Sequence, residues 1–297
     1  MKRRKFIQQS SMAVPAAFLP WPEFLMKPAS KYKFGLQLYT VRDAMEADPI
    51  GTLKKVRAMG YEDLELYGYD GEAGTFYGFT AVDFKKMLED ADLTTSSCHY
   101  GLPAFFDSSN DDLLRYVDQC IEGAHAVGHS FITWPWLDPK DRNMEGFKKL
   151  VPKLNAIGDR VVKGGLRFAY HNHGFEFDDH NGEIGYDLIV NETDPDLVKL
   201  QLDMYWVAHS SKLTSNEWIA KQPGRIVMWH IKDMHKVSRD YTELGNGSID
   251  YHPILPEAEK SGLEYYYLEQ GGNFAVNSMQ SISDSAEFFK KHLKKYL

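Results

Sequence analysis

Residues 167–177 read RFAYHNHGFEF, an apolar run that passes directly into two histidines around one asparagine. Successive side chains of a strand point to opposite faces. Alternation therefore places Phe168 and Tyr170 on one face of an expected strand, and places Ala169, His171 and His173 on the other. A strand of this kind has an apolar face for packing and a polar end for chemistry.

Short apolar or alternating runs of this type recur seven more times along the chain. The other expected strands are KFGLQLYT (33–40), YEDLELYG (61–68), LTTSSCHYG (93–101), SFITWPW (130–136), LVKLQLDMYW (197–206), RIVMWHIKD (225–233) and LEYYYLEQGG (263–272). Segments with helical spacing separate them, and several end at a glycine, as helices often do. The clearest are 49–60, 82–91, 111–128 and 147–165. A terminal helix is expected over 283–297, which opens with the capping residues Ser and Asp.

Strands that alternate with helices indicate parallel βα units and an α/β fold. Eight such units within 31–297 fit a single-domain (β/α)₈ TIM barrel, whose usual size is about 250 residues. The alternative is an open doubly wound sheet. The first strand–helix turn, LYTVRDAMEADP, lacks the GxGxxG phosphate loop, which counts against that alternative.

Composition limits the classes of partner. The chain has 297 residues, 43% of them hydrophobic and 26% charged, as in an ordinary globular protein. Its net charge of −8 disfavours nucleic acid, and no apolar run reaches the roughly 20 residues of an integral membrane span. A small-molecule substrate is expected. Two cysteines, Cys98 and Cys120, do not make a disulfide framework, and whether they pair is left open.

The first residues, MKRRKFIQQSSMAVPAAFLPWPEF, combine a basic start with a mildly apolar stretch. The pair Arg3-Arg4 resembles a twin-arginine export signal. Residues 1–30 are therefore expected to be a signal and linker, and the protein to be periplasmic. The alternative is a basic tail before an irregular arm, which would leave the protein in the cytoplasm.

Polar residues end four consecutive expected strands on the inward-facing side. They are His171, Asp203, His230 and Glu269. Active sites of barrels lie at these carboxyl ends, and burying such groups unpaired is costly. Two imidazoles and two carboxylates suit a divalent metal, Mn²⁺ first, with Zn²⁺, Co²⁺, Fe²⁺ or Mg²⁺ as alternatives. For Asp203, His230 and Glu269 the alternative is a purely structural role as a buried ion pair.

Further polar residues extend this candidate site. Strand alternation, or a position near a strand end, selects six more residues. Lys232 is one of them. The other five are expected to bind substrate: Gln37, Glu65, His99, Glu176 and Trp206. Plainer readings compete with these roles. Lys232 can pair with Asp203 or Asp233, Glu176 can cap a loop, and buried His99 and Glu65 can be hydrogen-bonded core residues.

Seven segments resemble the xylose isomerase-like TIM-barrel superfamily, also called the sugar phosphate isomerase/epimerase family, over most of residues 33–295. They are FGLQLYTVRD, GYEDLEL, YHNHGFEF, LQLDMYW, HIKDM, ELGNGSID and YYYLEQ. The resemblance implies one divalent metal held by Glu, Asp, His and Glu. Asp203, His230 and Glu269 match the last three ligands. His171 stands near the place of the first glutamate, with His173 as the competing ligand.

The family's epimerases exchange protons with carbon through two glutamates, of which only Glu269 remains here. The resemblance implies Glu269 or the free histidine as base, and Lys232 as a partner of the developing oxyanion. A metal-dependent sugar or keto-sugar isomerase or epimerase, acting through an enediolate, is the leading expectation. The YHNH pattern resembles a branch acting on keto-sugars, keto-glycosides and inositol-derived ketones, so a lyase or dehydratase is the alternative. A non-catalytic sugar-binding barrel is the second alternative, and a homo-oligomer is left open.

Overall fold

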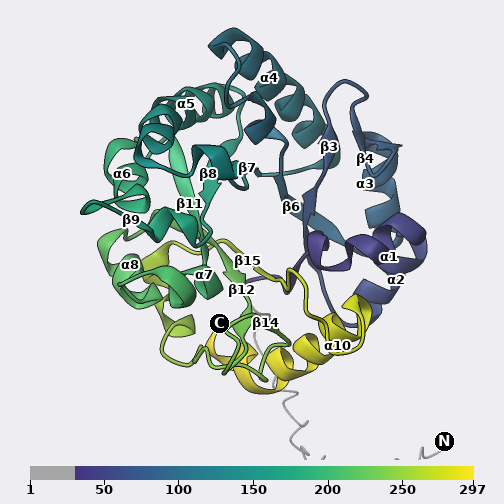
Figure 1. Cartoon of the computed structure of the whole chain (residues 1–297). Coiled ribbons are helices and arrows are strands. Elements are labelled where there is room, and N and C mark those ends of the chain that lie inside the picture. Colours follow the sequence, from purple (N-terminus) through teal and green to yellow (C-terminus); the bar gives the residue numbers. More distant parts are fainter. Residues whose placement is uncertain (1–30) are drawn as a thin grey trace, which may run out of the picture. The chain divides into compact units, whose positions relative to one another are not determined.

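The computed structural model describes residues 31–297, which fold into a closed barrel of eight parallel strands surrounded by helices (Figure 1). The order around the barrel is β1-β15-β12-β11-β8-β7-β6-β2. The barrel strands are β1 (Gly35–Gln37), β2 (Asp63–Tyr67), β6 (Thr94–His99), β7 (Phe131–Trp134), β8 (Arg167–His171), β11 (Val198–Asp203), β12 (Ile226–Ile231) and β15 (Tyr265–Leu268). All eight lie within the expected runs, so the single-domain (β/α)₈ barrel is confirmed and the open sheet is wrong.

The helices lie outside the barrel and at its rim. They are α1 (Arg42–Ala47), α2 (Pro49–Ala58), α3 (Ala81–Asp90), α4 (Asn110–Val127), α5 (Met144–Lys163), α6 (Gly185–Glu192), α7 (Met204–Ser210), α8 (Ser215–Lys221), α9 (Ala258–Ser261) and α10 (Ser278–Phe288). Side-chain caps begin several of them, such as Thr80 for α3 and Ser109 for α4. The last helix begins earlier than expected, because Asn277 accepts a hydrogen bond from the backbone of Gln280 and caps α10.

Short elements fill the connections. The small strands are β3 (Tyr69–Asp70), β4 (Thr75–Phe76), β5 (Phe79–Thr80), β9 (Asp179–His180), β10 (Glu183–Ile184), β13 (Asp233–Met234) and β14 (Tyr241–Thr242). The short helical turns are η1 (Leu38–Val41), η2 (Leu102–Phe105), η3 (Pro139–Asp141), η4 (Phe175–Phe177), η5 (Leu255–Glu257), η6 (Phe289–Leu293) and η7 (Lys294–Tyr296). Several of these lie after the carboxyl ends of barrel strands and build the mouth.

Two apolar layers hold the barrel together. A large cluster packs the strands against the helices, and a small one, including Phe131, Met228 and Tyr267, fills the inside. Gly35 allows β1 to approach β15, because a Cβ there would lie 2.1 Å from the backbone oxygen of Tyr266. Above the inner cluster the barrel interior becomes polar, and there the candidate site begins.

Three further expectations concern membrane spans, the two cysteines and the N-terminal segment. Within 31–297, no helix has the length and apolar character needed to cross a bilayer. Cys98 and Cys120 are both buried and both free thiols. The expected export signal, residues 1–30, lies outside the described residues and stays a prediction.

Candidate active site

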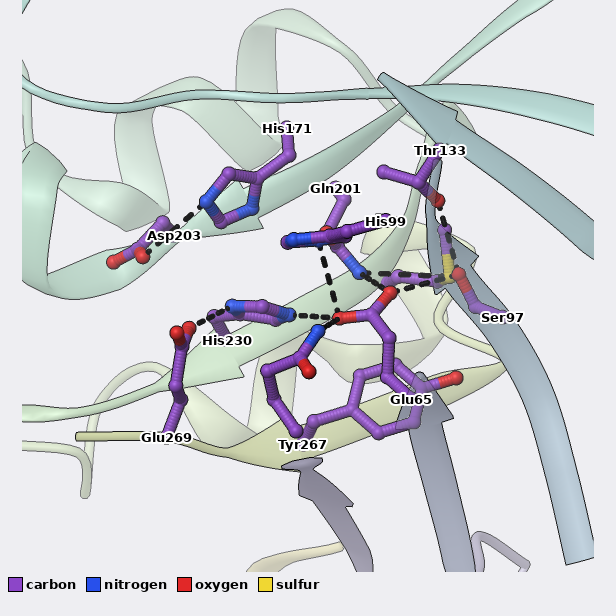
Figure 2. Close-up of polar contacts among 12 residues, drawn as sticks. Glu65, Ser97, His99, Thr133, His171, Gln201, Asp203, His230, Tyr267 and Glu269 are labelled. Carbon is purple, nitrogen blue, oxygen red and sulfur yellow. Dashed lines mark hydrogen bonds and ion pairs between the residues drawn. The ribbon is translucent and has the colours of Figure 1, made fainter. Parts of the chain in front are cut away.

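A buried cluster of ionisable side chains occupies the carboxyl end of the barrel (Figure 2). His171 ends β8, Asp203 ends β11, His230 lies near the end of β12, and Glu269 follows β15. The side chains of Asp203 and His230 are fully buried, and that of Glu269 is 8% exposed. Four consecutive strands of the barrel therefore deliver the predicted ligands to one place.

Lys232 neutralises two of these carboxylates. Its Nζ lies 2.7 Å from Asp203 Oδ2 and 2.7 Å from Glu269 Oε2, with the side chain 4% exposed. Burial alone lowers the pKa of Lys232, but the charges of Asp203 and Glu269 outweigh it and raise that pKa well above its ordinary value. Of the two pairings considered, the one with Asp203 is present. Asp233 instead accepts hydrogen bonds from backbone N–H groups.

His230 lies between two carboxylates, as Figure 2 shows. Its Nδ1 is 2.6 Å from Glu269 Oε2 and its Nε2 is 2.5 Å from Glu65 Oε2. Burial disfavours the charged ring, yet Glu65 and Glu269 raise the pKa of His230 to about 9. Burial likewise raises the pKa of Glu65, while His99 and His230 bring it down to about 2. In this arrangement His230 is an imidazolium that donates from both nitrogens.

Glu65 is the centre of a floor beneath the cluster. Its carboxylate accepts hydrogen bonds from Gln37 Nε2 at 2.8 Å, Gln201 Nε2 at 2.7 Å and Ser97 Oγ at 2.7 Å. Gln37 and Glu65 are fully buried and do not line the cavity described below. In this structure Glu65 contacts His230 and Gln37 contacts Glu65, and the expected role of both in substrate binding stays a prediction. Gln201 was missed as a site residue, although its inward parity was visible in the sequence.

Two histidines above this floor are electrically neutral. His171 Nε2 lies 3.7 Å from Asp203 Oδ2, and the ring centroids of His171 and His173 are 4.9 Å apart. Burial lowers the pKa of both rings well below the ordinary value. Among residues 31–297, the buried Nδ1 of each ring has no hydrogen-bond partner. Both rings therefore keep a nitrogen available for a ligand or a proton.

His173 and Glu176 belong to the loop after β8. The strand ends at His171, so His173 lies two residues beyond the alternation that was expected to point it inward. Glu176 is buried and accepts from Tyr170 Oη at 2.8 Å and from the backbone N–H of His173 at 2.9 Å. Burial raises the pKa of Glu176 to about 8. It fixes the His173 loop and is not among the residues that line the cavity, and its expected role in substrate binding stays a prediction.

Asp203 also begins α7. Its Oδ1 accepts hydrogen bonds from the backbone N–H groups of Tyr205 and Trp206, at 3.0 and 3.1 Å. The cap leaves Oδ2 for Lys232 and places Trp206 with its ring centroid 5.7 Å from that of His173. Trp206 thus supports the loop beside the site, and the residues that line the main cavity do not include it.

A cavity of about 660 Å³ opens above the cluster. His99, His171, His173 and Glu269 line one part of it. His99 Nε2 also donates to Gln201 Oε1, 2.8 Å away, and lies 3.2 Å from Glu65 Oε2. A substrate in this cavity reaches three imidazoles and one carboxylate, a set capable of acid–base chemistry.

The donor atoms fit a divalent metal. One ligand atom each from Asp203, His230 and Glu269 lies within 4.8 Å of the others, and so does one each from His99, His171 and His230. Carboxylate oxygens with imidazole nitrogens are the donors preferred by Mn²⁺, Fe²⁺, Co²⁺ and Zn²⁺. His173 belongs to neither group, which favours His171 as the histidine ligand. Binding would require the Lys232 ammonium to leave the two carboxylates and His230 to lose one proton.

A closed (β/α)₈ barrel with such a cluster at the carboxyl ends of its strands has the architecture of a barrel enzyme. The family model described as xylose isomerase-like TIM barrel matches residues 53–292. The chain belongs to this family, as its motifs predicted.

Similar proteins include members with different reactions. An inosose dehydratase from Clostridium perfringens is 26% identical over 239 residues, covering 69% of this chain and 79% of the relative. A sugar phosphate isomerase/epimerase from Parabacteroides distasonis has a TM-score of 0.79 and 26% identity, covering 93% of this chain and 99% of that one. An L-ribulose 3-epimerase, with a TM-score of 0.67 and 15% identity over 89% of this chain and 95% of that one, shows the same fold.

Proposed function

We propose that the chain is a divalent-metal-dependent enzyme that removes a proton from the carbon beside the carbonyl of a keto-sugar or keto-polyol. The observation that carries this proposal is the convergence of Asp203, His230 and Glu269 within 4.8 Å, beside a cavity that Glu269 also lines. Proton removal next to a carbonyl places negative charge on oxygen, and positive groups at that point lower the barrier.

The metal would be held by His171, Asp203, His230 and Glu269. When bound, it would act as a Lewis acid toward the carbonyl and a neighbouring hydroxyl of the substrate. Released from the carboxylates, the ammonium of Lys232 would donate a hydrogen bond to the oxygen that gains charge. In the metal-free chain, Asp203 and Glu269 raise its pKa and so keep it protonated.

Glu269 is the proposed proton acceptor. It lines the cavity, and although burial by itself raises its pKa, Lys232 and His230 hold that pKa well below the ordinary value. The carboxylate is therefore ionised at neutral pH. His173, which also lines the cavity, is an uncharged second acid–base group. These two groups flank the space where the reacting carbon would lie.

Elimination is the outcome that we favour, with loss of water or an alcohol from the carbon next to the one that loses its proton. Two features support it: the second glutamate of the epimerases is absent, and the curated relative is named as an inosose dehydratase. Isomerisation or epimerisation is the second candidate, supported by the name of the Parabacteroides protein. Export through the twin-arginine route is a separate proposal that rests on Arg3 and Arg4.

Reaction in deuterated water tests the proposal. Purified chain with Mn²⁺ is incubated with a panel of keto-sugars, 3-keto-glycosides and an inosose, and products are followed by NMR and mass spectrometry. Elimination predicts an unsaturated ketone together with released water or alcohol. Solvent deuterium at one carbon without loss of a group would instead support the isomerase or epimerase. If Glu269→Gln is as active as the parent chain, or no member exchanges or reacts, the proposed function is wrong.

A further inference from the structure

The cavity above the ionisable cluster has two chemically different halves. His99, His171, His173 and Glu269 lie in one half. The other half is built by the loops after β1, β2, β6 and β7, and its lining is mostly aromatic or apolar. It consists of Tyr39, Tyr67, Gly68, Tyr69, Tyr100, Gly101, Pro103, Ala104, Pro135, Trp136 and Asp138. The proposed reaction uses the first half and leaves the second without a role.

Tyr39 presents an aromatic ring to this second half. It lies in η1, just after β1, and remains 42% exposed. Its ring is held from two sides, with the guanidinium of Arg42 4.4 Å from the ring centroid and the ring of Tyr67 edge-on at 5.3 Å. Arg42 is fixed in turn, because it donates to the carbonyls of Tyr39 and Gly271. The ring is therefore oriented before any ligand arrives.

Trp136 presents a second ring, which is 40% exposed. Buried Trp134 donates from Nε1 to the carbonyl of Trp136 at 2.7 Å and so fixes the turn that carries it. The guanidinium of Arg142 lies 5.6 Å from the Trp136 ring centroid. Asp138, two residues further on, is exposed and lines the same half of the cavity, where its carboxylate can accept hydroxyl hydrogen bonds.

The charged groups around this half of the cavity disfavour a phosphorylated ligand. Among the described residues that line the cavity, none is Lys or Arg. The nearby guanidinium groups of Arg42 and Arg142 already donate to backbone carbonyls. A phosphate group placed here would meet the Asp138 carboxylate and no lining cation, whereas a neutral ring with hydroxyl groups meets aromatic faces and an acceptor.

We infer that the aromatic half is a subsite for a second sugar ring, joined by a glycosidic bond to the ring that reacts at the ionisable cluster. Tyr39 and Trp136 stack on the apolar C–H faces of that ring, and Asp138 binds its hydroxyl groups. The cavity volume of about 660 Å³ is in the range that encloses ligands of more than one ring. The inference rests on the proposed function only for the position of the reacting ring.

Binding of unreactive sugars tests the subsite without turnover. The full chain is titrated calorimetrically with cellobiose, maltose, glucose and glucose 6-phosphate. The variants are Tyr39→Ala and Trp136→Ala, with Tyr39→Phe and Trp136→Phe as controls that keep a ring, and thermal unfolding verifies that each folds. At least one disaccharide is expected to bind about tenfold or more tightly than glucose. That preference is expected to disappear in the alanine variants and to remain in the phenylalanine variants.

Three results would overturn the inference: no disaccharide binding, a preference unchanged by both alanine substitutions, or glucose 6-phosphate as the tightest ligand. Asp203→Asn separates this inference from the proposed function, because Asp203 does not line the aromatic half. If this variant still binds the disaccharide, the subsite is supported independently of the metal site. If, in addition, the parent chain neither holds metal nor reacts, the proposed function is rejected and the subsite is retained.

Discussion

Lys232 is the residue whose position has the clearest consequence for metal binding. Its ammonium bridges Asp203 and Glu269, the two carboxylates that are proposed as ligands. Loss of one partner from a buried ion pair usually costs about 3–5 kcal/mol, because a charge is left uncompensated. In a Lys232→Met variant Glu269 keeps only the His230 imidazolium, and Asp203 lacks its ion-pair partner until a divalent ion replaces it.

For Lys232→Met we expect a metal-free protein that unfolds at a lower temperature than the parent, and Mn²⁺ affinity raised about tenfold or more. Calorimetric titration with Mn²⁺, and thermal unfolding with and without a chelator, measure both effects. Lys236→Met, which removes an exposed lysine from the nearby loop, is the control for net charge. Unchanged or weaker Mn²⁺ binding by Lys232→Met would contradict the competition between ammonium and metal.

Glu176 is expected to make the stability of the folded chain depend on pH. In the folded chain burial raises its pKa to about 8, whereas its ordinary value is 4.5. Between these values the folded state holds a proton that the unfolded state has released. The contribution of Glu176 is thus complete below pH 4.5 and is lost as the pH rises toward 8, by at most about 1.4 kcal/mol per unit.

Glu176→Gln is expected to flatten this slope, because the amide stays neutral and can keep the hydrogen bonds to Tyr170 and His173. Urea unfolding of parent and variant between pH 5 and pH 8 measures the difference. Glu183→Gln, which changes an exposed glutamate that pairs with Lys148, is the matched control. A slope in Glu176→Gln as steep as that in Glu183→Gln would show that Glu176 is already ionised across this range.

At the scale of elements, Asp233 in β13 organises the loop that follows β14. Its carboxylate accepts hydrogen bonds from the backbone N–H groups of Gly245, Gly247 and Ile249, at 2.9–3.1 Å. The two glycines in GNGSID, taken alone, favour a mobile turn. Their backbone is instead bound to one buried side chain, 12 to 16 positions earlier in the chain, which pattern reading within the loop does not reveal.

Replacing Asp233 by Ala is expected to free this loop and leave three partly buried N–H groups without their acceptor. Hydrogen exchange at residues 245–249 should accelerate by at least about tenfold, while exchange in the barrel strands changes little. Asp250→Ala removes an exposed carboxylate from the same loop and serves as the control. Equal exchange in the two variants would mean that Asp233 does not hold the loop.

At the scale of the whole molecule, the barrel follows from the sequence because alternation and strand–helix order are local signals. The depth at which a side chain lies inside the barrel depends on how neighbouring strands pair, and this is not a local signal in the sequence. Parity pointed Glu65 and His99 inward alike, but the paired strands place Glu65 level with Ser97 and His99 level with Tyr67, one inward step higher. Glu65 therefore lies in the floor and His99 reaches the cavity. His173 lies beyond the end of β8 at His171, where the chain leaves the sheet, and still lines the cavity.

The most direct measurement is the metal content of the purified chain, with calorimetric Mn²⁺ titration of the metal-free form. Asp203→Asn is the test variant, because asparagine also caps helices and keeps α7 in place. Asp250→Asn is the control. One divalent ion per parent and control chain, with binding lost in Asp203→Asn, is the predicted result. A parent chain that binds no stoichiometric divalent ion, or an Asp203→Asn variant that binds it equally well, would contradict the metal site.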